Sequence, residues 1–180
     1  MDIYGLSLVN VETWGFLWGG VSFAMIAGGM FVAKYGVGKN PLKSIMIVNV
    51  VSWISCIIFP IQASIILLII GMVVWMFLMP IAESAEQTVI QNIVPQERQG
   101  RVFGFAQSIE SSAMPVTAFL VGPLASSIFI PFMTTGKGVE YIGSWFGSGE
   151  SRGIALVFIT AGFVGVIVTV FAWTSKPYKT

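Results

Sequence analysis

Long stretches without any charged residue most strongly limit how this chain can fold. Residues 63–82 and 154–173 contain no Asp, Glu, Lys or Arg, and apolar side chains dominate both stretches. A helix that crosses the hydrocarbon core of a bilayer needs about 20 such residues. Only 9% of the chain is charged, whereas soluble domains average about 25%, so water cannot solvate most of the surface of this fold. The sequence therefore predicts an integral membrane protein with the lipid bilayer as a partner.

Three further apolar runs bring the number of predicted spans to five. Asn40 and Pro41 open the second span, and Pro60 closes it. Strands are the competing interpretation of runs rich in Val and Ile, but strands of membrane barrels need only about 10 residues and alternate in polarity. We therefore predict an all-α integral membrane fold with five transmembrane helices at about 14–33, 42–59, 62–92, 102–132 and 154–173.

The basic residues predict the orientation of these spans. Lys137 and Arg152 fall on one side of the predicted membrane, and the other seven basic residues fall on the opposite side: Lys34, Lys39, Lys43, Arg98, Arg101, Lys176 and Lys179. By the positive-inside rule the side with seven is cytoplasmic. We expect a multi-pass protein of the cell (plasma) membrane with its N-terminus outside and its C-terminus in the cytoplasm. An outside N-terminus without a signal peptide is unusual and indicates that an upstream part is missing.

The segment 134–151, between the fourth and fifth spans, is rich in Gly and Ser and falls on the external side. Its aromatic residues Tyr141, Trp145 and Phe146 favour an interfacial loop that rests at headgroup level. A lid over a binding site is the alternative.

Small residues and prolines predict how the spans pack and bend. Gly20, Ala24 and Gly28 recur every four residues, and a face of this kind lets another helix approach closely. The predicted fourth span has a similar face, with Gly104, Ser108, Ser111 and Pro115. Prolines inside a helix remove a backbone hydrogen bond and can bend it; we expect such kinks at Pro80, Pro115 and Pro123.

Three glutamates lie within otherwise apolar spans. Counting back from Val94 at 1.5 Å per residue places Glu83 about 16 Å deep and Glu86 about 12 Å deep. Glu110 is about 15 Å from Gly100 in the following span. A carboxylate in hydrocarbon costs roughly 2.5–3.5 kcal/mol on the most lenient scale, so each needs water, a proton or a cation.

A polar surface extends from these acids. Gln87 lies beside Glu83 and Glu86 on one helix face, and Gln107 lies three residues before Glu110. Our functional hypothesis is that these residues line an aqueous cavity and carry protons or bind a cation. The alternative is structural: the acids bond helix ends or hold Arg98 and Arg101 near the cytoplasmic mouth.

The composition excludes several classes of function. Histidine is absent and Cys56 is the only cysteine, which removes histidine chemistry, disulfides and cysteine metal sites. A net charge of +1 leaves no basic surface for a nucleic-acid partner. We therefore expect no metal and no cofactor. We expect no enzyme either, because Glu and Ser are the only chemistry available to a membrane-embedded active site.

The stretch IQNIVPQERQGRVFGFAQSIE, followed by MPVTAFLVGPLA, resembles the C-terminal half of the major facilitator superfamily, in its drug and macrolide efflux branch. Matching positions of its loop between helices ten and eleven are Gln91, Val94, Pro95, Glu97, Gly100, Arg101 and Val102. The stretch GMFVAKYGVGK is similar to that family's loop between helices eight and nine. There Gly29, Lys34 and Gly36 match, and Ala33 replaces an Asp that is common in the family.

The resemblance covers nearly the whole chain and implies that residues 1–180 are a partial C-terminal domain, with helices eight to twelve of a twelve-helix fold. It implies a secondary transporter that exports small amphipathic compounds in exchange for protons by alternating access, together with a missing N-terminal half. Cytoplasmic loop or gate residues implied by it are Lys34, Gly36, Glu97, Arg98, Gly100 and Arg101. The alternative is a small non-transporting membrane protein that acts as a regulatory or packing subunit.

Overall fold

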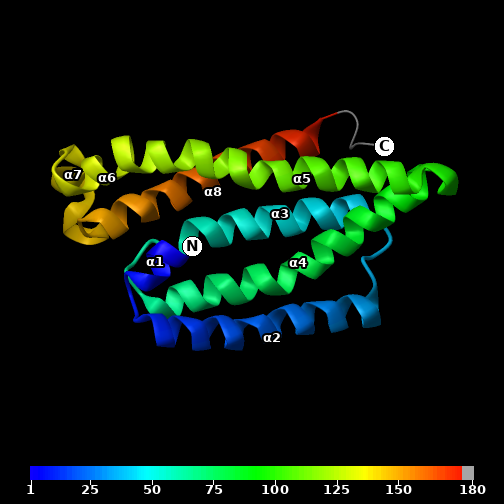
Figure 1. The fold of residues 1–180 in the computed structure, drawn as a ribbon, viewed down its shortest axis with the longest axis horizontal. Coiled ribbons are helices and arrows are strands. Elements are labelled where there is room, and N and C mark those ends of the chain that lie inside the picture. Colours follow the sequence, from blue (N-terminus) through cyan, green and yellow to red (C-terminus); the bar gives the residue numbers. More distant parts are fainter. Residues whose placement is uncertain (176–180) are drawn as a thin grey trace.

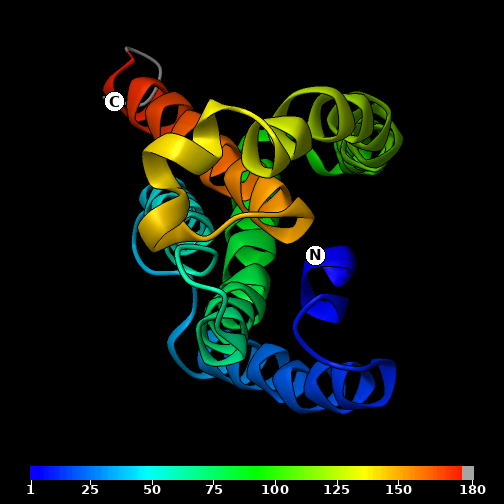
Figure 2. The ribbon, with the colours of Figure 1, turned by 90° about the vertical axis from the view of Figure 1, so that its left-hand side faces the viewer.

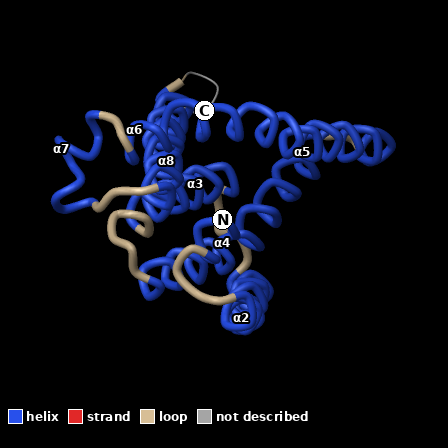
Figure 3. The backbone as a smooth tube through the Cα atoms, turned by 60° about the vertical axis from the view of Figure 1, so that its left-hand side comes forward, coloured by secondary structure: helices blue, strands red, loops and turns tan. Residues whose placement is uncertain are grey.

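The computed structural model describes residues 1–175, so Lys176 and Lys179 lie outside the described residues. Within this range the fold contains helices and connecting loops and no strand (Figures 1 and 3). The elements in chain order are α1 (Asp2–Leu6), α2 (Val11–Tyr35), α3 (Pro41–Ile58), α4 (Ile65–Ile93), α5 (Gln96–Leu124), the π-helical turn η1 (Ala125–Phe129), α6 (Ile130–Thr134), α7 (Lys137–Phe146) and α8 (Glu150–Thr174).

Five helical segments are long and apolar enough to cross a membrane, which confirms the all-helical class and the predicted number of spans. They are α2, α3, α4, the continuous segment Gln96–Thr134 and α8. The first span begins earlier than predicted because the Asn10 side chain caps α2, accepting a hydrogen bond from the Thr13 amide at 2.8 Å. The fourth begins at Gln96, directly after Pro95, rather than near residue 102.

Residues 134–151, which we predict to be an interfacial loop between the fourth and fifth spans, contain a short helix. Residues 137–146 form α7, which starts after Gly136 and ends at Gly147, whose φ of +90° stops the helix. Tyr141 and Trp145 are exposed on this helix, whereas Phe146 is buried. The segment therefore folds as a short helix that docks one of its three aromatic side chains into the protein.

Four of the spans form one packed group. α4 packs against α2 and α3, and α3 packs in turn against α8. Glycines permit the closest approaches: a methyl group at Gly28 would collide with the Phe77 carbonyl, and methyl groups at Gly162 or Gly165 would meet Trp53. Gly20, which the sequence placed on the same packing face as Gly28, has open space beside it.

Helix α5 stands apart from this group. Figure 2 shows α5 to one side of the packed helices, and α5 packs only sparsely against α4. Within the described residues, none of α5 is buried. A methyl group added at Gly104 would meet no neighbour, so the predicted small-residue face of this span has no packing partner here.

A buried arginine ties together the end of the fold at which α1, α7 and α8 meet. Arg152 is 3% exposed. Its guanidinium donates to the carbonyl oxygens of Phe146 and Ile61 and to the Tyr4 hydroxyl, and it lies 4.0 Å from the centroid of the Phe146 ring. Tyr4 in turn donates to the Gln62 carbonyl at 3.3 Å. Burial raises the pKa of Tyr4, and the positive charge of Arg152 opposes part of that rise.

Candidate functional site

A polar pocket of about 320 Å³ lies between α4 and α5. Glu83, Glu86 and Gln87 line it from α4, and Gln107 and Glu110 line it from α5. These are the five residues that the sequence singled out as cavity candidates, and the structure brings all of them together. Three less polar residues complete the wall: Ile90, Phe103 and Ala106.

Local geometry explains why these side chains share one pocket. Residues three or four apart lie on one face of a helix, which groups Glu83, Glu86 and Gln87 on α4. The chain then reverses at Val94 and Pro95, where the Gln99 side chain donates to the Val94 carbonyl at 3.0 Å. This tight reversal turns the start of α5 back along α4 and sets the two polar faces opposite each other.

The pocket is acidic and roomy. All three glutamates are exposed to it, and no Lys or Arg is among its lining residues. Gln107 donates to the Glu110 carboxylate at 3.5 Å, a long contact that orients the acid only loosely. Among residues 1–175, no three Asp, Glu or Cys side chains gather closely enough to hold a metal ion. Separated carboxylates beside apolar side chains suit a proton or a bulky amphipathic cation better than a compact metal ion.

Several nearby hydroxyl groups are already used by their own helix. Ser108 donates to the Gly104 carbonyl and Ser112 to the Ile109 carbonyl, both at 2.7 Å. They therefore stabilise α5 rather than contribute donors to the pocket, which leaves the carboxylates and carboxamides as its polar groups.

The predicted gate residues lie at the membrane-end turns, outside the pocket. Gly36 ends α2 with a φ of +67°, and the Lys34 ammonium lies 5.1 Å from the Tyr35 ring centroid. Glu97, Arg98, Gly100 and Arg101 occupy the exposed first turns of α5. Neither arginine lines the pocket, so the acids do not hold them within it.

The prolines predicted to bend the spans lie inside helices. Pro80 interrupts α4, which bends along its length in Figure 1. Pro115 and Pro123 lie in α5, and the π-helical turn η1 begins two residues after Pro123. Such wide turns are frequent near functional sites, and here the turn connects the splayed helix to α6.

Arg152 is the polar residue that sequence reasoning missed. It was counted only as one of two basic residues on the external side, whereas it is buried and fully bonded. Its acceptors come from Tyr4, Ile61 and Phe146, which are far apart in the chain. No local sequence pattern therefore predicts this hydrogen-bonded cluster around Arg152.

Compared with known proteins, the chain matches no protein-family model, no curated protein and no solved structure. The candidate site therefore stands on the five polar residues between α4 and α5 and on their apolar surroundings.

Proposed function

We propose that this chain is part of a secondary active transporter that exchanges protons for small amphipathic compounds, cationic ones in particular. The observation that carries the proposal is the convergence of Glu83, Glu86 and Glu110 on one pocket between two apolar helices. A carboxylate at this depth must be hydrated, protonated or paired, and a group that changes between those states is what proton coupling needs.

The pocket also has the mixed character that an amphipathic substrate requires. Its carboxylates would attract a positive charge, while Ile90 and Phe103 offer apolar and aromatic contact to the rest of the molecule. Gln87 and Gln107 supply neutral hydrogen bonds that can remain when a carboxylate takes up a proton.

A second helical bundle would complete the site. α5 exposes polar and apolar residues on all sides, and hydrocarbon is a poor solvent for its polar side. We infer that another bundle, such as the N-terminal half implied by the sequence resemblance, faces this pocket. Substrate would then move by rocking of the two bundles around it.

The charge distribution supports an orientation for this transporter. Lys34, Lys39, Lys43, Arg98 and Arg101 gather at the end where α2 and α4 finish and α3 and α5 begin (Figure 1). Lys137 and Arg152 are at the other end. Under the positive-inside rule the first end faces the cytoplasm of a plasma membrane and the α7 end faces outward.

A non-transporting packing subunit is the second candidate, and the loose attachment of α5 favours it. A helix without a buried residue is suited to docking against another membrane protein. This candidate predicts complex formation without movement of substrate, and it gives the pocket acids no role in proton transfer.

The test uses everted vesicles from cells that make the protein together with its natural partners, with ethidium as the cationic probe. An inside-acid pH gradient should drive ethidium uptake, and Glu83→Gln and Glu110→Gln should each abolish most of the dependence on that gradient. Glu150→Gln, at the exposed start of α8, is the matched control and should transport normally. Unchanged pH dependence in both pocket variants would refute proton coupling through these residues. Absence of any gradient-driven uptake by the wild-type protein would favour the packing subunit.

A further inference from the structure

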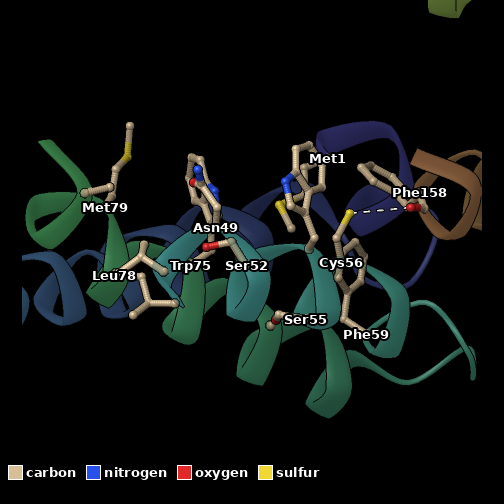
Figure 4. Close-up of a pocket in the computed structure, with 14 residues that line it drawn as sticks. Met1, Asn49, Ser52, Ser55, Cys56, Phe59, Trp75, Leu78, Met79 and Phe158 are labelled. Carbon is tan, nitrogen blue, oxygen red and sulfur yellow. Dashed lines mark hydrogen bonds between the residues drawn. The ribbon is translucent and has the colours of Figure 1, made fainter. Parts of the chain in front are cut away.

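A second cavity, of about 420 Å³, lies between α3 and α4 and reaches α8 (Figure 4). It is largely apolar and partly open, with Trp75 and Met79 from α4 and Phe158 from α8 among its lining residues. None of the five residues of the acidic pocket lines it. Its volume falls in the range of about 300–1,000 Å³ that is typical of small-molecule sites.

One helix contributes a row of polar side chains to this cavity. Asn49, Ser52 and Ser55 of α3 all line it, and the first two lie about 12 Å and 16 Å along the helix from Pro41. They are therefore near the middle of a membrane span, where water is scarce. Figure 4 shows Asn49 and Ser52 between Leu78 on one side and Cys56 on the other.

These polar groups are not used by the protein itself. Hydroxyl groups in other spans donate to their own helix, as Ser22, Thr88 and Thr160 do to the carbonyls four residues earlier. Among the hydrogen bonds within residues 1–175 none is made by the Asn49 or Ser52 side chain, and both residues are half-buried, with polar atoms that are still accessible. An amide and a hydroxyl facing an apolar cavity at this depth need an outside partner.

The chemistry of the lining limits what that partner can be. No Asp, Glu, Lys or Arg side chain lines the cavity, and the α-amino group of Met1 is the one charged group among its lining residues, so a cation in particular would lose its hydration and gain no opposite charge. An amide and hydroxyls both donate and accept, which matches an alcohol, ester or amide group. Aromatic and aliphatic side chains on either side would contact an apolar body.

We propose that the cavity between α3 and α4 binds a neutral amphipathic molecule, with its polar group at Asn49 and Ser52 and its apolar body along Trp75 and Phe158. A neutral membrane lipid and a free amphiphile share this chemistry. The site is separate from the acidic pocket, so this inference does not depend on the proposed transport function.

The sequence supplies a reporter for occupancy. Cys56 is the only cysteine of the chain, lines the cavity and donates to the Phe158 carbonyl at 3.5 Å (Figure 4). A molecule in the cavity should shield its thiol from N-ethylmaleimide. The full chain in phosphatidylcholine nanodiscs would be labelled in the presence of 1-decanol, decanoate or decyltrimethylammonium, and the rate followed by mass spectrometry.

We expect 1-decanol to slow labelling of Cys56 several-fold and the two ionic probes to have little effect. Asn49→Leu keeps the volume and removes the polar group, so about tenfold more 1-decanol should be needed for half-protection, the effect of one lost hydrogen bond at an otherwise apolar site. Ser52→Ala, which adds no volume, should act in the same direction. Ser22→Leu, on the exposed side of α2, is the control and should not change protection.

Three results would overturn the proposal: no protection by 1-decanol, equal protection by all three probes, or unchanged protection in both Asn49→Leu and Ser52→Ala. The last two would mean that the probes act through the bilayer. If 1-decanol does protect Cys56, native mass spectrometry of protein taken directly from its membrane distinguishes the two sources of the natural ligand. A neutral lipid that co-purifies with the wild-type chain and not with Asn49→Leu indicates a membrane lipid, whereas protection without a co-purified lipid indicates a free amphiphile.

Discussion

Replacing Arg152 by Met tests whether the buried arginine holds one end of the fold together. The substitution keeps the unbranched apolar stem and removes the guanidinium, which bonds to the carbonyls of Ile61 and Phe146 and to the Tyr4 hydroxyl. The buried Phe146 carbonyl and the partly buried Ile61 carbonyl then lose a charged donor, at about 1–3 kcal/mol each, and the stacking on Phe146 is lost as well. We expect a loss of about 3–5 kcal/mol in the free energy of unfolding.

Thermal unfolding in detergent would measure this loss, with a fluorogenic maleimide reporting exposure of Cys56. At roughly 2–4 °C per kcal/mol for a chain of this size, the midpoint should fall by about 10 °C. Arg152→Lys keeps the charge but offers a compact ammonium in place of the planar guanidinium. Its unfolding midpoint should therefore lie between those of the wild type and Arg152→Met.

Arg98→Met is the matched control, because Arg98 is an exposed arginine at the opposite end of the spans. A surface change of this kind should alter stability by less than about 0.5 kcal/mol. If Arg152→Met unfolds at the same temperature as Arg98→Met, the three hydrogen bonds do not stabilise the fold and the reasoning fails.

Two further predictions follow from the packing and from the buried phenol. Gly28→Ala should lower the free energy of unfolding by about 1–3 kcal/mol, because its methyl group meets the Phe77 carbonyl. Gly20→Ala has free space for the methyl group and should raise the free energy of unfolding by up to about 1 kcal/mol. Thermal unfolding of the two variants should show these opposite changes. Because the pKa of Tyr4 is raised in the fold, the protonated phenol contributes fully to the free energy of unfolding below about pH 10. This contribution declines as pH rises through the raised pKa. The unfolding midpoint should therefore drop as pH rises above about 10, and Tyr4→Phe should flatten that drop; equal pH profiles would contradict the assignment.

Apolar runs determined most of what could be predicted about the fold. A run such as 63–82 has one viable structure in a bilayer, since only a helix satisfies its own backbone, and the structure has five such helices. The helix α7 within segment 134–151 was not predicted, because Gly and Ser are common in this segment and the contact of Phe146 with Arg152 is not visible in the local sequence. Glycine spacing identified Gly28 but not Gly162 and Gly165, whose role appears only once α3 is in place.

The grouping of the acids could be predicted from the sequence because it needs only helical periodicity and one tight turn. Glu83 and Glu86 share a face of α4, and reversal at Pro95 brings Glu110 alongside. The Arg152 cluster and the apolar cavity could not be predicted from the sequence, because each combines segments that are distant in the chain. Asn49 and Ser52 look like ordinary polar interruptions of a span until the cavity beside them is known.

Helix α4 is the wall shared by the two cavities, and its sequence places them next to each other. Met79 and Ala82 line the apolar cavity, Glu83 lines the acidic pocket, and Pro80 removes a backbone hydrogen bond at the same level. A change of bend at Pro80 would therefore alter both cavities together. If both proposed sites are occupied, and if each ligand binds one bend more tightly than the other, a neutral ligand in the apolar cavity and a proton or cation in the acidic pocket change each other's affinity by the same factor.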